Sequence, residues 1–368
     1  MHQIGKAILV VLFLFGLANT AASESISSAH VEIIASGLNK PYGLFLKKNG
    51  DLLIADSGSA TPYQPSAADG KIFELTKEGV LKTLLSGLPS RWFIGNTEGP
   101  MSIAIDPDYE HNEHLFVNIG IAYKQDTGSL FEVYNALGFS VLVYDLEKYT
   151  LIEKYANLLD AEAIFNPDKR PSLESNPTKI KFGKEKILYV VDSAANAVWQ
   201  VDKYRRVTTF AVLPLYDLPP GVSSMEEKIE PVPTSITIRG SKAYVSLFTG
   251  WPFIPGFGRI IEVDINKGEQ KEFVTGLNFP VDVEIDHYGN LYILEYTSSF
   301  NPATGFQLNS GRILRLEHGG SFEVILEGIN SPRDMVIDRN GTIYVSCLEQ
   351  NSYEAETGKG LILKITRQ

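Results

Sequence analysis

Oxygen-bearing side chains beside prolines are the residues of this sequence best suited to hold a metal ion. Glu98 stands two positions before a proline and Asn176 directly before one, whereas Asp282 and Asp334 each follow a proline by two positions. Carboxylate and amide oxygens are the donors that a hard cation such as calcium prefers. If the fold brings these positions together, Glu98, Asn176 and Asp282 form a calcium site, with Asp334 as a fourth donor.

The same residues have a structural alternative. The two residues that precede prolines would then cap turns, and Lys179 or Arg333 would neutralise the two aspartates. Buried carboxylates need such partners, because an unpaired charge is costly to remove from water. The choice between a metal site and paired carboxylates therefore depends on which elements carry these residues.

The prolines mark six copies of one repeat. The copy from Leu277 to Glu295 opens with a turn ending at Pro280, after which apolar and acidic residues alternate up to Asp286. This period of two indicates a half-buried strand. A tight turn, an apolar second strand and a third strand that begins near a glycine follow. The other copies are centred on Pro41, Pro100, Pro177, Pro233 and Pro332.

The spacing of the copies predicts the fold. They lie about 45 to 75 residues apart, the range of four-stranded propeller blades with loop insertions. We therefore predict an all-β fold, a six-bladed β-propeller of four-stranded blades, over residues 24–368. A fourth strand follows each of the first five copies, and the segment from His30 to Gly37 has the pattern of the missing sixth. We expect this N-terminal strand to complete the last blade and close the ring.

The predicted insertions gather on one face of the propeller. Loops after second strands and before first strands emerge on the same side, and the long ones span 57–70, 118–139, 158–175, 214–232, 246–258, 295–310 and 347–360. Long loops on a rigid scaffold commonly carry binding residues. Because these loops are rich in aromatic residues, they predict an apolar or aromatic small molecule as the ligand.

The loop of the fourth copy is the strongest candidate for that site, since prolines at 252 and 255 restrict its backbone. The predicted ligand-binding residues, three aromatic ones from this loop and three polar ones near the ends of second strands, are Trp251, Phe253, Phe248, Asn118, Asp192 and Glu295. The alternative for the aromatic residues is that they pack the insertions onto the ring. A Ser-His-Asp triad is not expected at the mouth, because His114 and His287 fall in turns of the opposite face, and no other catalytic residue is assigned.

Composition excludes some partners and predicts the cellular compartment. The formal net charge is -11 and the lysines are scattered, which argues against nucleic acid. Residues 1–23 combine a short basic start, an apolar run and a small-residue stretch, the pattern of a secretory signal peptide. We expect an exported protein, periplasmic or extracellular, without stable membrane insertion after cleavage. Cys347 is the one cysteine, so stability must come from packing.

The repeat resembles NHL-type propellers, and longer stretches resemble one family within them. The segments SNPTKIKF with LYVVDSAANAVWQVD, PVPTSITI with YVSLFTGWPFIPGFGRIIEVD, and FPVDVEIDHYGNLYILE look like the ScyD/ScyE family of exported propellers linked to scytonemin biosynthesis. This resemblance covers nearly the whole mature chain. It implies an exported six-bladed propeller with an accessory role in such secondary metabolism, and it brings no catalytic residues.

A more distant resemblance is to propellers of the gluconolactonase and strictosidine-synthase type. Members of the gluconolactonase type hold a divalent metal at the channel mouth through Glu, Asn and Asp. The turn from Glu98 to Pro100 resembles their E-G-P turn. The chain departs from their pattern in having a proline after Asn176 and no glycine after Asp282.

The sequence thus leaves three functions open. The first is a non-catalytic propeller that binds a small apolar or aromatic molecule at the channel mouth. The second is a lactonase or hydrolase that depends on calcium or another divalent cation, and the third is a scaffold for a protein partner.

Overall fold

The computed structural model describes residues 29–93, 95–106, 114–120, 123–124, 137–224 and 227–367. The predicted signal peptide lies outside these residues, as does most of the insertion at 118–139. Regular structure in the described part is almost entirely strand, apart from the short helix α1 (Leu158–Phe165) and the 3-10 turn η2 (Lys184–Lys186). The predicted all-β fold class is confirmed.

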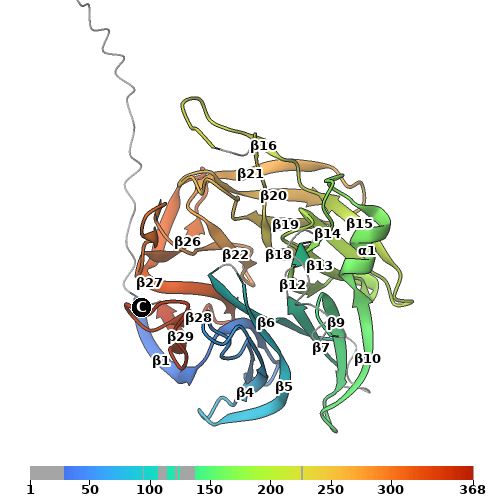
Figure 1. Cartoon of the computed structure of the whole chain (residues 1–368). Helices are drawn as coiled ribbons and strands as arrows, with labels where there is room; N and C mark the ends of the chain where they lie inside the picture. The colour runs from blue at the N-terminus through green and yellow to red at the C-terminus, as the bar shows by residue number, and fades with distance from the viewer. Residues whose placement is uncertain are drawn as a thin grey trace, which may run out of the picture.

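Within the described residues, the strands form groups of four antiparallel strands that follow one another around a ring (Figure 1). Each group is called a sheet below, although hydrogen bonds join the first group to the second, and one long strand belongs to both of the last two. In chain order they are β2 (Pro41–Leu46), β3 (Leu52–Asp56), β4 (Ser66–Leu75) and the start of β5 (Leu81–Phe93); β6 (Asn96–Ile105), β7 (His114–Gly120), β9 (Ser140–Asp145) and β10 (Thr150–Asn157); β12 (Pro177–Phe182), β13 (Leu188–Asp192), β14 (Ala197–Val201) and β15 (Val207–Val212); β18 (Pro233–Arg239), β19 (Lys242–Leu247), β20 (Gly258–Asp264) and β21 (Gln270–Leu277); β22 (Pro280–Ile285), β23 (Leu291–Glu295), β26 (Gly311–Leu316) and the start of β27 (Phe322–Ile337); and the end of β27 with β28 (Ile343–Leu348), β29 (Gly360–Arg367) and β1 (Ala29–Leu38).

Contacts between the innermost strands close the ring. β2 contacts β6, and the series continues through β12, β18, β22 and β27 back to β2. β1 pairs antiparallel with β29, from Ala29 opposite Arg367 to Leu38 opposite Gly360, and the two lie side by side in Figure 1. The predicted closure by the N-terminal strand is confirmed. Because β29 pairs with β28 on one side and with β1 on the other, the C-terminal strand is not an unpaired sheet edge.

Every innermost strand begins with the same irregularity around its proline. The register with the second strand shifts between Pro41 and Leu44 in the first sheet and between Pro280 and Asp282 in the fifth, and the other four sheets shift at the matching place. Proline cannot donate a hydrogen bond to the sheet, and a bulge redirects the residue that it leaves unpaired. The repeat proline therefore sets which residues face the channel mouth.

Apolar clusters between neighbouring sheets form the core. Leu53, Leu115 and Leu142 are fully buried in the cluster that joins the first two sheets. Trp199 is fully buried in the next one, and its indole N–H donates to Asp192. Cys347 lies in the core of the last sheets, where burial raises the pKa of its thiol to about 12. Such a thiol is a packing residue rather than a nucleophile.

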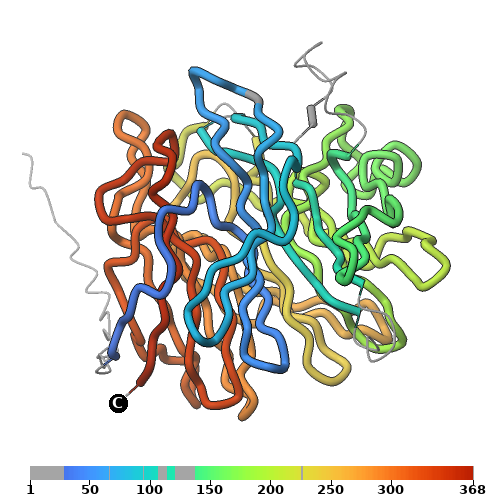
Figure 2. The backbone as a smooth tube through the Cα atoms, turned by 90° about the horizontal axis from the view of Figure 1, so that it is seen from below, coloured from blue at the N-terminus to red at the C-terminus, as the bar shows by residue number. Residues whose placement is uncertain are grey.

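The insertions contain little regular structure. Besides α1, the described parts form three two-stranded sheets, β8 (Tyr123–Lys124) with β11 (Glu174–Ser175), β16 (Tyr216–Asp217) with β17 (Lys228–Ile229), and β24 (Phe300–Asn301) with β25 (Gly305–Phe306). Figure 2 shows the blue loop after β3 and the green α1 region on the same upper side of the ring. No helix in the described residues is long and apolar enough to cross a bilayer.

Candidate functional site

A cavity of about 260 Å³ lies at the loop-bearing mouth of the channel. In every sheet, the residue that follows the repeat proline lines it, and these six residues are Tyr42, Met101, Thr178, Thr234, Val281 and Arg333. The bulge at each proline explains this placement, because it turns that residue out of the strand ladder. Phe248, Asn96 and Asn176 add to the wall.

The floor of this cavity is an ion cluster. Lys179, Asp282 and Asp334 each stand two positions after a repeat proline, one layer deeper than the wall. The Lys179 ammonium lies 3.5 Å from a carboxylate oxygen of Asp282 and also pairs with Asp334. All three are almost completely buried. The cluster joins three innermost strands, β12, β22 and β27, across the channel.

Each aspartate of the cluster is also held by the backbone of the next sheet. An oxygen of Asp282 accepts from the Met335 amide at 2.8 Å, and an oxygen of Asp334 accepts from the Leu44 amide at 2.7 Å. Ser235 donates its hydroxyl to Asp282. These contacts fix both carboxylates in place and occupy both oxygens of Asp282.

The charges of the cluster balance. Burial opposes the charge of Lys179, but Asp282 and Asp334 together raise its pKa, so it stays protonated. Burial likewise opposes the charge of Asp282, and Lys179 with the hydrogen bonds lowers its pKa. Burial and the charge of Asp282 raise the pKa of Asp334 well above its usual value. Of the two aspartates, Asp282 is therefore the one that ionises more easily beside the Lys179 ammonium.

Arg333 forms a second fixed network in the cavity wall. Its guanidinium carbon lies 4.8 Å from the centre of the Tyr42 ring and 5.0 Å from that of Tyr296, and the group pairs with Glu354. Burial opposes the charge, but Glu354 and the two tyrosines raise the pKa of Arg333. Burial raises the pKa of Tyr42 to about 12. The wall therefore presents a charged but compensated arginine and a neutral phenol.

Asn176 offers the cavity an acceptor. Its backbone N–H donates to the Asp192 carboxylate at 2.6 Å. Its side-chain oxygen is buried without a hydrogen-bond partner in the described residues. An unsatisfied buried carbonyl is unusual, because its desolvation is not compensated. A hydrogen-bond donor that enters the cavity would satisfy it.

The three predicted metal ligands have different partners in the structure. Asp282 is occupied by Lys179 and the backbone, and Glu98 pairs with Arg91 at 3.1 Å. The side-chain oxygen of Asn176 has no hydrogen-bond partner in the described residues. Two cations, Lys179 and Arg333, line the same cavity and disfavour a further positive charge. Lys179 is thus the group that pairs with Asp282 and Asp334 in this structure, as the paired-carboxylate alternative expects.

The predicted aromatic site separates into one cavity residue and two packing residues. Phe248 lines the cavity, but Trp251 and Phe253 do not. The Trp251 ring meets Phe253 and Phe300 edge-on, with 5.9 Å between centroids in both pairs, and is 40% exposed. These contacts join the loop of the fourth sheet to the β24–β25 hairpin of the fifth.

The three predicted polar residues lie inside the ring structure and do not line the cavity. Asp192 and Glu295 are fully buried and accept from the backbone of the turn that precedes the repeat proline, Glu295 from the Asn278 amide at 2.6 Å. Asn118 donates its side-chain amide to the Pro177 carbonyl at 2.7 Å. Their hydrogen bonds hold the turns that position the wall residues.

The residues that sequence reasoning missed are those directly after the proline, above all Tyr42 and Arg333. The signal was available, because the six copies align on that proline. The predicted set instead mixed positions before the proline with positions two after it, and these lie in different layers of the channel.

Comparisons with known proteins identify the fold. No family model matches the sequence, and no curated protein matches it either. Solved structures do match over nearly the whole chain. The PQQ-bound aldose sugar dehydrogenase from Streptomyces coelicolor has a TM-score of 0.56 at 14% identity, covering 93% of this chain and 99% of its own.

Two further structures match equally well. A gluconolactonase from Xanthomonas campestris has a TM-score of 0.55 at 10% identity, covering 92% of this chain and 90% of its own. Regucalcin from Agrobacterium tumefaciens, described as a calcium-binding protein, has 0.55 at 10% identity, with coverages of 93% and 95%. At these identities the likeness concerns the fold alone, and this chain has a β-propeller fold similar to that of these proteins.

Proposed function

We propose that this protein binds a small, neutral and mainly apolar or aromatic molecule in the cavity at the loop-bearing mouth. The observation that carries the proposal is the buried Asn176 oxygen without a partner in the described residues, at the wall of a cavity that Phe248, Met101 and Val281 make largely apolar. An apolar pocket with a few fixed polar groups is the usual form of a small-molecule site.

The size of the cavity limits the ligand to about one substituted ring. A cavity of about 150 Å³ holds benzene, and this one measures about 260 Å³. Phe248 packs against Phe279 and Phe306 behind it, so its ring is held in place before the ligand arrives. A preformed wall of this kind reduces the entropy lost on binding.

The electrostatics favour a neutral ligand with a hydrogen-bond donor. Lys179 already has Asp282 as a carboxylate partner and Arg333 has Glu354, so neither needs an anion from the ligand. The Asn176 oxygen is an acceptor and calls for a hydroxyl or N–H group. Phenols and indoles combine a ring with such a donor.

The test is a comparison of phenol with toluene, two rings of similar shape of which only phenol can donate. We expect phenol to bind more tightly by about 2- to 10-fold, the scale of one net hydrogen bond. Asn176→Ala should remove that difference, and Phe248→Leu should weaken both molecules. Equal affinities in the wild type, or no saturable binding of either, would refute the proposal.

A calcium-dependent lactonase is the second candidate, favoured by the likeness to gluconolactonase and regucalcin and by the free Asn176 oxygen. It requires Asp282 to leave Lys179 and Glu98 to leave Arg91 when the ion binds. Calcium would then raise the melting temperature by mass action, and purified protein would open a sugar lactone only with the metal. Absence of both effects removes this candidate.

We further infer that the protein acts after export and meets its ligand in the periplasm or outside the cell. The resemblance of the sequence to ScyD/ScyE propellers supports an accessory role in scytonemin-type metabolism, where aromatic molecules would be the ligands. A protein partner on the loop-bearing face is compatible with this role. Fractionation of the host and mass spectrometry of the mature N-terminus test the export, since cleavage should occur near Ala22.

A further inference from the structure

A second cavity, of about 340 Å³, opens at the opposite end of the channel, where the short turns lie. The wall is built from the third, fourth and fifth positions after the repeat prolines. It includes Phe45 from β2, Ile103 and Ile105 from β6, Phe182 from β12 and Ile337 from β27. Lys179 lines both cavities, so the ion cluster separates them.

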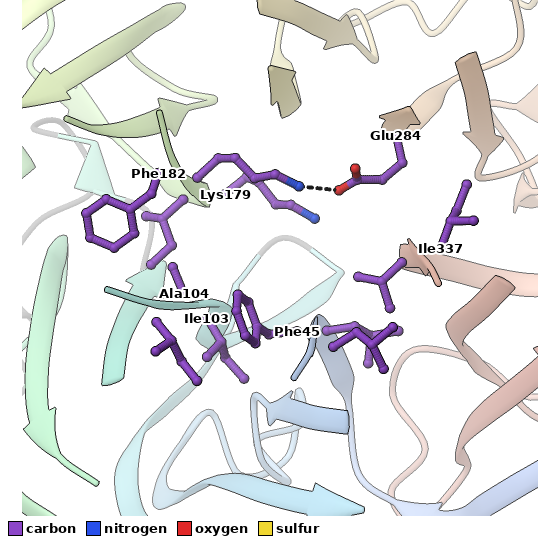
Figure 3. A pocket seen from close by; sticks show the side chains of 13 residues that line it. Phe45, Ile103, Ala104, Lys179, Phe182, Glu284 and Ile337 are labelled. Carbon is purple, nitrogen blue, oxygen red and sulfur yellow. Dashed lines mark hydrogen bonds and ion pairs between the residues drawn. The ribbon is translucent and has the colours of Figure 1, made fainter. Parts of the chain in front are cut away.

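The walls of this turn-side cavity are mostly apolar. In Figure 3 the side chains of Phe45 and Ile103 lie across the cavity from Lys179 and Glu284. Phe45, Phe182 and Ile337 remain partly exposed, although they belong to innermost strands. Apolar surface in a concave site gains most when a ligand of matching shape displaces the water there.

The polar groups form one side of the cavity. The Lys181 ammonium lies 2.7 Å from one oxygen of Glu284, and the other oxygen accepts from the Thr237 hydroxyl at 3.1 Å. Glu284 is buried and both of its oxygens are used, whereas the Lys181 side chain is 35% exposed. An ammonium group has three N–H donors. The cavity therefore offers donors and positive charge to a ligand rather than acceptors.

We propose that the turn-side cavity binds an amphipathic monocarboxylate, with its apolar chain against Phe45, Ile103 and Ile337 and its carboxylate at Lys181. The cavity has more than twice the volume of about 150 Å³ that holds benzene, which suits a chain of roughly eight carbons. This site uses other residues than the proposed function and stands independently of it.

The test is calorimetric titration with octanoate, octanol and octylammonium, which share a chain and differ in the head group. Octanoate should bind most tightly and octylammonium least, by at least 10-fold. Lys181→Met should reduce octanoate below the affinity of octanol, because the Glu284 carboxylate then repels the head group of octanoate alone. Glu284→Gln should strengthen octanoate several-fold, because it removes the competing carboxylate while Thr237 can still donate to the amide oxygen.

A matched pair of variants locates the site. Val336→Phe fills the turn-side cavity, whereas Val281→Phe fills the mouth cavity with the same side chain. Only Val336→Phe should weaken octanoate, and only Val281→Phe should weaken phenol, so failure of one proposal is distinguishable from failure of the other. The turn-side proposal is overturned if octylammonium binds as tightly as octanoate, if both phenylalanine variants act alike on octanoate, or if no octanoate binding saturates.

Discussion

Replacement of Lys179 by methionine should strongly destabilise this propeller. Methionine has a similar length but no charge, so the variant leaves Asp282 and Asp334 without a cation. Lys179 is 7% exposed and the two aspartates 1% and 4%. A pair at about 4 Å is worth about 4 kcal/mol at an effective dielectric constant of 20, and burial of the ammonium offsets part of this. Removing one partner of a buried pair costs about 3 to 5 kcal/mol.

The destabilisation by Lys179→Met should depend on pH, in a direction that follows from the pKa shifts of the aspartates. In the wild type the pKa of Asp282 is lowered, so its contribution to stability is present above the unfolded pKa and is lost as the pH falls through the folded one. In the variant, both aspartates are buried without a cation, which raises their pKa values. Ionisation then costs the variant stability as the pH rises. The difference from the wild type should be largest near neutral pH and should shrink towards pH ~4, near the carboxyl pKa of unfolded chains.

The assay is urea unfolding followed by tryptophan fluorescence at pH 4 to 7, with two matched variants. Lys181→Met removes a partly exposed pair and should cost about 1 kcal/mol or less. Lys179→Met combined with Asp282→Asn should recover most of the loss, because only Asp334 is then left without a cation, and burial favours its neutral form. A loss of under ~1 kcal/mol in Lys179→Met, equal at all pH values, would refute the charge-balance reasoning.

Three further substitutions test other parts of the structure. Gly43→Ala should lower the free energy of unfolding in urea by about 1 to 3 kcal/mol, because a Cβ there would lie 2.4 Å from the Met101 carbonyl oxygen. At Gly250 the nearest atom to a Cβ is 3.3 Å away, so Gly250→Ala should lower it less. Burial beside other carboxylates raises the pKa of Glu162 from 4.5 to about 8, so the stability of the wild type should fall as the pH rises from about 4.5 to about 8. Glu162→Gln should therefore be more stable than the wild type at pH ~8 and equally stable near pH ~4. Equal stabilities of the two proteins at both pH values would contradict this. Trp251→Ala should lower the melting temperature slightly without changing phenol affinity, since Trp251 packs on neighbouring loops and does not line the mouth cavity; a selective loss of phenol binding would restore it to the site.

The fold could be predicted because the physical signals repeat. A proline that cannot pair, followed by alternating residues, occurs six times, and each copy becomes an innermost strand. The closing strand was also predictable. The last repeat copy lacks a fourth strand, and the segment before the first copy has the pattern of one. The pairing of Ala29 with Arg367 shows the result.

The site was harder to predict, because the depth of a residue in the channel depends on where each strand bulges. Asp282 and Asn176 belong to different layers, although both stand near a proline. The partner of Asp282 is Lys179, which is 103 positions away and two sheets away around the ring. The sequence supplies the candidates for such a pair but not their rotamers, so it cannot choose between a metal site and paired carboxylates.

The pairing of β1 with β29 also constrains the order of assembly. The last sheet needs hydrogen bonds between residues at opposite ends of the described chain, so it cannot be completed while the C-terminal strand is still being made. Until β29 has been made, β1 has no partner strand. Until β1 docks, β29 is paired with β28 alone. Contacts of such long sequence separation form slowly. A circular permutant that joins residues 29 and 367 by a short linker would make this sheet local. If the chain is opened at the exposed turn 77–79, the long-range pairing moves to β4 and β5, so the late-forming contacts should shift from the last sheet to the first.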